Sequence, residues 1–236
     1  MISTPGIAMN NPAAASSTMT PAERTALQRA LSSAIHYLEY GAGESTRLAV
    51  AQANLQTIVS VESDPAYIES ALRTQAEIRQ AEQAGRLKFL IADIGPTQKW
   101  GKPMDESKRH LWPAYALCPY RHGYMPDTIL IDGRFRVACG ILAALQCPPA
   151  ATILIHDYCN RPQYHVLSKF LDITETADHL VVCHAKAQVD TDRANKLLSL
   201  YLYEPRDADP RPFTGMRALW KRLLRKLGRH PFKTPT

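Results

Sequence analysis

Short apolar runs, many of them β-branched, alternate with helical stretches through most of this 236-residue chain. Such runs are typical of strands that are buried on both faces. Strands separated by helices favour parallel pairing, because a parallel connection needs a dozen or more residues. We therefore predict an α/β fold with a Rossmann-like, doubly wound and mostly parallel sheet. The predicted strands are 36–40, 57–62, 87–92, 128–131, 152–155, 171–175 and 179–184.

The ends of this pattern carry further local signals. The last two predicted strands are close enough in sequence to pair antiparallel, which predicts an antiparallel last strand. Thr20, Pro21 and Glu23 have the order of a helix cap, a first helical position and a capping-box acid. The predicted helices are 21–34, 45–54, 65–83, 135–146 and 192–203.

The length fits one catalytic domain with appendages. We expect a mobile segment over residues 1–20, which are rich in Ala, Ser, Thr, Asn and Pro, and a folded domain over residues 21–205. Residues 95–126 form a long insertion at the edge where ligands bind, as lids and acceptor pockets do. The five cysteines form no C-x-x-C pair, which favours reduced thiols and a cytoplasmic protein.

Positive charge is concentrated in the predicted tail, residues 206–236. The formal net charge is +6, but Pro210–Thr236 holds eight Lys or Arg and no acid, so the rest of the chain is slightly acidic. Residues 215–229 have the spacing of a basic amphipathic helix. This helix would either contact the inner face of an anionic membrane or dock on the domain or a second subunit. Nucleic acid is a less favoured partner, since the tail lacks several aromatic residues for stacking.

A glycine turn stands where the first predicted strand meets its helix. Gly41 and Gly43 would let a ligand approach the backbone closely, although an ordinary tight turn that binds no ligand can have the same glycine pattern. Glu62 ends the second strand 21 residues after Gly41, where a carboxylate can accept both ribose hydroxyls of a nucleoside. This spacing suits NAD and S-adenosylmethionine (SAM) equally.

Two features separate these nucleosides. The dinucleotide fingerprint has a third glycine, and Thr46 stands in its place. The sulfonium and amino group of SAM are positive, and Glu39 and Glu44 flank the turn with negative charge. The turn therefore favours SAM over NAD.

The stretch from His36 to Thr46 resembles the first motif of class I SAM-dependent methyltransferases, and the resemblance continues through 61–64, 91–94 and 130–133. It implies that Glu62 holds the ribose, that Asp93 binds the adenine amino group, and that Asp132 lies at the methionine part with the glycines. The implied cofactor-binding set is Glu39, Gly41, Gly43, Glu44, Ser45, Glu62, Asp93, Ile94 and Asp132.

Residues after the fourth and fifth strands should face the transferred methyl group, because ligands bind at the carboxyl ends of parallel strands. His156 and Asp157 are candidate bases for an acceptor hydroxyl, and Asp132 completes the catalytic set. Asp132 and Asp157 also resemble the carboxylates that bind Mg²⁺ in catechol-type and macrolide-sugar O-methyltransferases. His156 replaces one acid of the usual pair, so the metal and a metal-free site both stay open.

The acceptor side is rich in arginine. Arg134, Arg136 and Arg161, with Tyr158 nearby, could grip a carboxylate or phosphate, or the arginines could pair with the aspartates. The insertion adds aromatic residues that would stack on a sugar ring or pack on one another; they are Trp100, Trp112, Tyr115, Tyr120 and Tyr124.

The segments 131–139 and 155–158 resemble uncharacterised bacterial methyltransferase-like proteins and, more distantly, the plant enzymes that methylate glucuronic acid on xylan. This resemblance implies O-methylation of a sugar, a glycan or another small hydroxylated acceptor. Two alternatives remain. One is an NAD-linked oxidoreductase, and the other is a non-catalytic SAM-fold protein whose tail binds a membrane or a partner.

Overall fold

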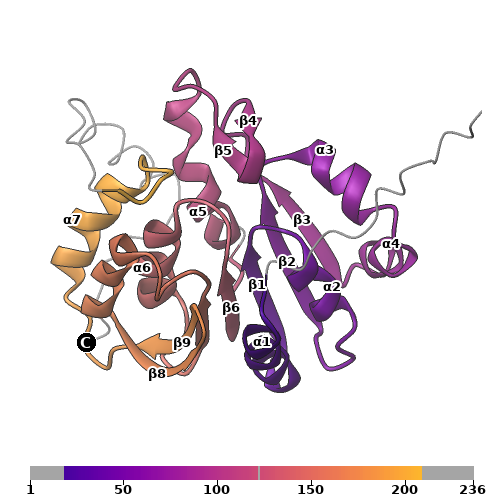
Figure 1. The fold of residues 1–236 in the computed structure, drawn as a ribbon, viewed down its shortest axis with the longest axis horizontal. Coiled ribbons are helices and arrows are strands. Elements are labelled where there is room, and N and C mark those ends of the chain that lie inside the picture. The colour runs from indigo at the N-terminus through magenta and orange to yellow at the C-terminus, as the bar shows by residue number, and fades with distance from the viewer. Residues whose placement is uncertain (1–18, 122, 209–236) are drawn as a thin grey trace, which may run out of the picture.

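A seven-stranded sheet runs through the centre of the molecule (Figure 1). The structure is a computed structural model that describes residues 19–121 and 123–208. The strands of the sheet are β1 (His36–Tyr40), β2 (Thr57–Glu62), β3 (Leu87–Ile91), β6 (Thr128–Ile131), β7 (Thr152–Ile155), β8 (Leu171–Ala177) and β9 (Leu180–Ala185). Their order is β3-β2-β1-β6-β7-β9-β8.

The pairing of the strands confirms the predicted fold class. The strands β3, β2, β1, β6 and β7 are parallel neighbours, and the last strand in sequence, β9, is antiparallel to both β7 and β8. Consecutive parallel strands need crossovers, and the chain order reverses between β1 and β6. Ligands of open α/β sheets bind at such a reversal, outside the carboxyl ends of the strands.

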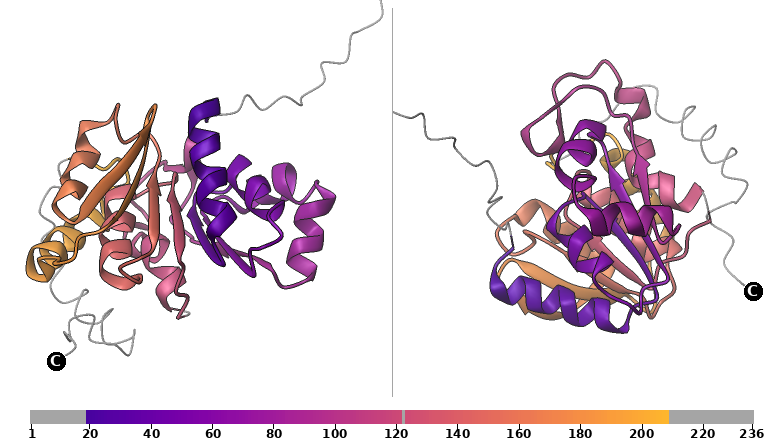
Figure 2. Two further views of the ribbon diagram at one scale, coloured as in Figure 1. Left: turned by 90° about the horizontal axis from the view of Figure 1, so that it is seen from below. Right: turned by 90° about the vertical axis from the view of Figure 1, so that its right-hand side faces the viewer.

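Helices cover both faces of the sheet (Figures 1 and 2). One layer consists of α1 (Pro21–Ser33), α2 (Glu44–Val50), α3 (Pro65–Tyr67), η1 (Ile68–Leu72) and α4 (Ala76–Gln83). The other layer consists of α5 (Pro113–Arg121), α6 (Arg136–Gln146), η4 (Pro162–Lys169) and α7 (Thr191–Tyr201). Each layer buries its own apolar cluster against the sheet, which is why the strands are apolar on both faces.

The single helix predicted over residues 65–83 is broken in the structure. A π turn follows α3, and Gln75 has an extended backbone before α4 begins. Leu72 and Ile78 are six positions apart, a spacing that does not repeat on one helical face. The break allows both side chains to be buried in the same core.

The predicted insertion is only partly an appendage. It begins with a small hairpin in which η2 (Lys99–Gly101) connects β4 (Thr97–Gln98) to β5 (Lys102–Pro103). The short helix η3 (Arg109–Leu111) follows the hairpin. Its second half is α5, a helix that was not predicted from the sequence. This helix packs against α6 and β2 and belongs to the core of the domain.

The folded domain extends slightly beyond its predicted bounds. Met19 is buried and Thr20 caps α1, although both fell in the segment predicted to be mobile. Asp207, assigned to the tail, is buried and accepts from the backbone N–H groups of Arg136 and Val137 at the start of α6. The rest of the predicted N-terminal segment and the basic helix 215–229 lie outside the described residues.

A search of residues 19–121 and 123–208 finds no helix that is long and apolar enough to span a bilayer.

Candidate functional site

The predicted glycine turn lies where β1 and β6 end side by side. Gly41 has a φ of +94°, and a Cβ at this position would lie 2.8 Å from the Cα of Gly133. Its N–H donates to the carbonyl of Val61 at 2.9 Å. Only glycine accommodates both the positive φ and this close backbone contact. The backbone of the turn is thereby fixed at the reversal of strand order.

Glu62 connects the end of β2 to this turn. Its Oε1 accepts from the backbone N–H groups of Ser63 at 2.6 Å and Asp64 at 3.0 Å, while Oε2 accepts from Ala42 at 3.2 Å. A carboxylate oxygen can accept more than one hydrogen bond, so Oε2 keeps capacity for a ligand hydroxyl. The side chain is 9% exposed and lies where the sequence analysis expects a ribose.

Glu39 stabilises the glycine turn through a hydrogen bond to Thr46. It is fully buried in β1, the Thr46 hydroxyl donates to its Oε1, and the Tyr37 hydroxyl donates to its Oε2 at 3.2 Å. The Thr46 hydroxyl in turn accepts from the N–H of Gly43 at 2.9 Å. Burial raises the pKa of Glu39 from 4.5 to about 7, although its hydrogen bonds act in the opposite direction.

The buried Glu39 carboxyl should make the stability of the protein depend on pH. Its pKa is higher in the folded protein than in the unfolded chain, so between pH 4.5 and about 7 the folded state holds a proton that the unfolded state releases. Stability attributable to Glu39 therefore falls as pH rises through this window. We expect Glu39→Gln to raise the free energy of unfolding by about 2–3 kcal/mol at pH 8 and by much less at pH 4.

Urea denaturation of the wild type and of Glu39→Gln at both pH values measures this difference. The exposed Glu77→Gln serves as the control and should not change it. A Glu39→Gln variant that gains no stability between pH 4 and pH 8 relative to the wild type would contradict the prediction.

The remaining predicted cofactor residues have mixed environments. Glu44 begins α2 and pairs with Arg24 of α1 at 2.5 Å, and Ser45 beside it is buried. Asp93 follows β3 and is half-exposed. Lys108 of the insertion lies 2.5 Å from its Oδ2, and this contact holds the pKa of Asp93 below its usual range. Lys108 therefore pairs with the carboxylate that is predicted to bind the adenine amino group.

Ile94, also predicted at the cofactor, is buried in the core. Its backbone carbonyl accepts from the indole N–H of Trp112 at 2.9 Å. The side chain of Ile94 therefore supports the insertion from within the apolar cluster.

The predicted catalytic residues Asp132, His156 and Asp157 meet at the ends of β6 and β7. His156 Nδ1 lies 2.9 Å from Asp132 Oδ1 and 4.0 Å from Asp157 Oδ1. Burial tends to lower the pKa of His156, but the hydrogen bond and charge of Asp132 outweigh it and raise the pKa. For Asp132, burial is likewise outweighed, by Arg136 and His156, and its pKa is lowered.

Arg136 holds this cluster together. Its guanidinium lies 3.0 Å from Asp132 Oδ1 and 3.3 Å from Asp157 Oδ2, and it donates to the carbonyls of Asp132, Gly133 and His156. The residue is 3% exposed. The predicted role of Arg136 in gripping an acceptor is not supported, because its donors are already engaged inside the protein.

Of the other predicted acceptor residues, two reach the surface of this edge. Arg134 is partly exposed and its Nε donates to the Gly133 carbonyl at 3.1 Å, while Arg161 pairs with Asp157 at 3.2 Å. Tyr158 is instead buried, with its ring 4.9 Å from that of His165. Arg134 and Arg161 are therefore the arginines available to an acceptor.

A bacterial protein of known structure is similar to this chain in fold and in sequence. It is a methyltransferase-like protein from Silicibacter pomeroyi DSS-3, 31% identical to this chain, with a TM-score of 0.69. The match covers 80% of this chain and 97% of that protein. This chain belongs to the family of methyltransferase-like proteins. No protein-family model matches the sequence, and no curated protein does either.

Two more distant structures are each 14% identical in sequence to this chain. The N-methyltransferase NodS from Bradyrhizobium japonicum WM9 has a TM-score of 0.41 and matches 70% of this chain and 88% of its own. An RNA methyltransferase from Salinibacter ruber has a TM-score of 0.40 and matches 73% and 97%. Both were crystallised with S-adenosylhomocysteine.

Most aromatic residues of the insertion pack inside this methyltransferase-like fold. Trp112 and Tyr115 are buried, and Tyr120 and Tyr124 pack against the same core, whereas Trp100 is 67% exposed. The alternative in which the insertion packs on its own aromatics therefore describes all of them except Trp100. These side chains were indistinguishable in sequence, because α5 was not recognised.

The hairpin of β4 and β5 lies close to the carboxyl ends of β2 and β6. A Cβ on Gly101 would lie 3.2 Å from the hydroxyl of Ser63 and 3.9 Å from Cγ of Arg134. Ser63 follows β2 and Arg134 follows β6, so the hairpin lies across the ends of both strands. The role of this hairpin as a lid stays a prediction.

Tyr67 and Glu23 were not predicted at the site from the sequence, and Tyr115 was predicted only as one of the aromatic residues of the insertion. Tyr67 lies beside the glycine turn, with its hydroxyl 3.6 Å from the position of a Cβ on Gly43. The hydroxyl of Tyr115 accepts from the N–H of Arg134 at 3.2 Å. Glu23, considered only as a helix cap, faces His156. Only the tertiary fold brings these side chains to the site.

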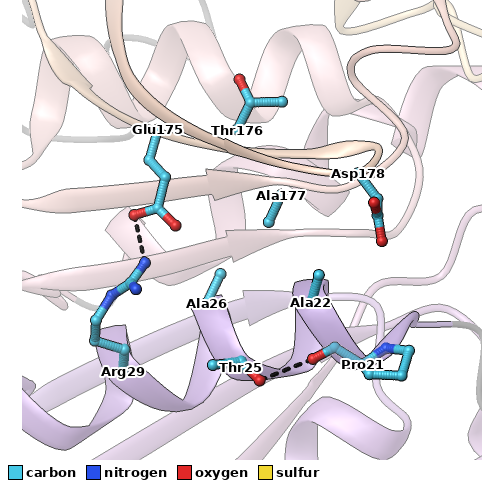
Figure 3. A pocket seen from close by; sticks show the side chains of 9 residues that line it. All are labelled: Pro21, Ala22, Thr25, Ala26, Arg29, Glu175, Thr176, Ala177 and Asp178. Atoms are coloured by element: carbon cyan, nitrogen blue, oxygen red, sulfur yellow. Dashed lines mark hydrogen bonds and ion pairs between the residues drawn. The ribbon is translucent and has the colours of Figure 1, made fainter.

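A shallow groove lies elsewhere, between α1 and β8 (Figure 3). Arg29 and Glu175 form an ion pair across it. None of the residues predicted at the site lines this groove.

Proposed function

We propose that this protein is a SAM-dependent methyltransferase. The observation that carries the proposal is the junction of β1, β2 and β6, where the Gly41 turn packs on Gly133 and Glu62 accepts from Ala42. Its glycine backbone and carboxylate suit a nucleoside, and the family is methyltransferase-like.

Calorimetric titration of the full chain with SAM, S-adenosylhomocysteine and NAD tests the cofactor. We expect both adenosyl compounds to bind and NAD not to bind. Binding of NAD alone would favour the oxidoreductase. Binding of none of the three would leave a non-catalytic protein that uses its tail for a membrane or a partner.

We further propose that the methyl group goes to a hydroxyl of a sugar, a glycan or another small acceptor that carries negative charge. Arg134 and Arg161 support an anionic acceptor, because guanidinium groups bind carboxylates and phosphates with paired hydrogen bonds. The resemblance to the plant enzymes that methylate glucuronic acid also favours this class of acceptor. Labelled SAM incubated with a cell extract, followed by isolation of the labelled product, identifies the acceptor.

In this reaction the positively charged sulfur of SAM supplies the methyl group. The acceptor oxygen would bond to the methyl carbon as the bond between that carbon and the sulfur breaks, which releases S-adenosylhomocysteine, and the hydroxyl proton would pass to a base of the protein. Asp157 is the better placed base. Its Oδ2 is held by Arg136 and Arg161, whereas its Oδ1 lies 4.0 Å from His156 and is free of the close contacts made by Oδ2. His156 has both ring nitrogens facing carboxylates and is suited to ordering Asp132.

The same cluster fits Mg²⁺ poorly. Ligand atoms of Asp132, His156 and Asp157 do lie within 4.8 Å of one another. However, Mg²⁺ prefers oxygen ligands, and the Arg136 guanidinium already pairs with both carboxylates. Asp132 and Asp157 therefore do not fit a Mg²⁺ site, and the proposed reaction needs no metal there.

Methyl transfer should accordingly be insensitive to chelation. The assay uses labelled SAM and the extract fraction that contains the acceptor. We expect EDTA to change the initial rate by less than about 2-fold, because Arg136, and not a metal ion, neutralises the charge of Asp132 and Asp157. Addition of Mg²⁺ should have an equally small effect. If EDTA abolished the transfer and Mg²⁺ restored it, the prediction of a metal-free reaction would be wrong.

A further inference from the structure

His156 lies between carboxylates from two distant parts of the chain. Its Nδ1 is 2.9 Å from Asp132 Oδ1 at the end of β6, and its Nε2 is 3.3 Å from Glu23 Oε2 in the first turn of α1. Such contacts at both ring nitrogens restrict rotation of the imidazole. The orientation of His156 therefore depends on Glu23 as well as on Asp132.

Glu23 is itself fixed by contacts that restrict its movement. Its Oε2 also accepts from the Thr20 N–H at 2.8 Å, and its Oε1 accepts from the His179 N–H at 3.0 Å, in the turn between β8 and β9. The side chain is 1% exposed. A capping-box glutamate functions equally well at the surface, so capping does not require this burial. The carboxylate links α1, the β8–β9 turn and His156.

Charged groups surround His156 from each neighbouring element. Asp132 comes from the end of β6, Asp157 from the residue after His156, Glu23 from α1 and Arg136 from α6. Arg136 contacts Asp132 at 3.0 Å, and His156 contacts the same Oδ1 atom. The direction of the Asp132 carboxylate is thus set jointly by Arg136 and by an imidazole that Glu23 holds.

We propose that Glu23 is a positioning residue for methyl transfer, acting through His156 on Asp132. This inference rests on the proposed function. Glu23 does not touch the cofactor turn, and Asp132 keeps its ion pair with Arg136 when Glu23 is removed. The removal should therefore disturb methyl transfer far more than SAM binding. The first turn of α1 is accordingly part of the acceptor site, although it lies 133 positions from His156 in the sequence.

The test compares Glu23→Ala with Thr20→Ala in the full chain. Thr20→Ala removes the hydroxyl that caps α1 and donates to Asp178, but it leaves the contact between Glu23 and His156. We expect Glu23→Ala to lower the rate of transfer from labelled SAM into the extract fraction by about 10- to 100-fold, which is the usual loss when a residue that orients a functional side chain is removed. The dissociation constants of SAM and S-adenosylhomocysteine should change by less than about 3-fold. Thr20→Ala should keep the wild-type rate.

A second variant and a spectrum separate positioning from folding. Glu23→Gln keeps one oxygen, which can accept from His156 Nε2 and the Thr20 N–H, but it places an NH₂ group against the His179 N–H. We therefore expect it to recover only part of the rate. In imidazole ¹⁵N spectra, the His156 signals, assigned by their loss in His156→Asn, should shift in Glu23→Ala and remain unshifted in Thr20→Ala.

The outcomes distinguish this inference from the proposed function. Equal rates for Glu23→Ala and Thr20→Ala, or a loss of SAM affinity as large as the loss of rate, would overturn the role of Glu23 alone. Unshifted His156 signals in Glu23→Ala would do the same. Failure of the wild-type protein to bind SAM would overturn the proposed function, and the role of Glu23 in the reaction with it.

Discussion

Replacement of Glu62 by alanine should weaken SAM binding by about 100-fold or more. The carboxylate would accept the ribose hydroxyls, and hydrogen bonds to a charged group contribute about 1.5–3 kcal/mol each. The substitution also leaves the N–H groups of Ala42, Ser63 and Asp64 without their acceptor, so the turn loses its tie to β2. Calorimetric titration with SAM and S-adenosylhomocysteine measures the loss.

Two further variants sharpen this test. Glu62→Gln preserves the shape but places an amide NH₂ group where backbone N–H groups donate, so it should bind SAM nearly as weakly as the alanine variant. Glu77→Ala removes an exposed glutamate of α4 and should bind SAM like the wild type. Wild-type affinity in Glu62→Ala would refute the placement of the ribose at the end of β2.

Replacement of Gly41 by alanine should destabilise the fold itself. A Cβ at Gly41 would lie 2.8 Å from Gly133 Cα and 2.9 Å from Gly133 N, and the φ of +94° is unfavourable for alanine. Strain of this kind and overpacking each cost about 1–3 kcal/mol, so we expect a loss of about 3 kcal/mol or more in the free energy of unfolding. Urea denaturation measures it, and SAM binding should be lost as well.

Gly43 in the same turn provides the matched control. The nearest atom to a Cβ there is the Tyr67 hydroxyl at 3.6 Å, an ordinary contact. Gly43→Ala should therefore lose less than about 1 kcal/mol of stability. If the two variants proved equally stable, the close contact between the backbones at Gly41 and Gly133 would not be the constraint that we infer.

The local patterns in the sequence predicted the sheet well. The apolar runs at 36–40, 57–62, 128–131 and 152–155 coincide with β1, β2, β6 and β7, because a strand buried on both faces is marked by its composition. Predictions failed where tertiary packing decides. The helix over 65–83 is broken to bury Leu72 and Ile78 together, and α5 was not recognised because the helix itself contains two prolines, Pro113 and Pro119.

Local sequence patterns were enough to predict the α/β class, the glycine turn and the identities of the residues at the strand ends. Their spacing follows from the strand-turn-helix repeat, which is a local property. Which of these side chains can meet a ligand depends instead on tertiary packing. Arg136, predicted to grip the acceptor, is enclosed by Asp132 and Asp157, and Glu23, predicted only as a cap, faces His156. Such partnerships depend on how distant segments pack, because burial obliges every charged group to find a partner.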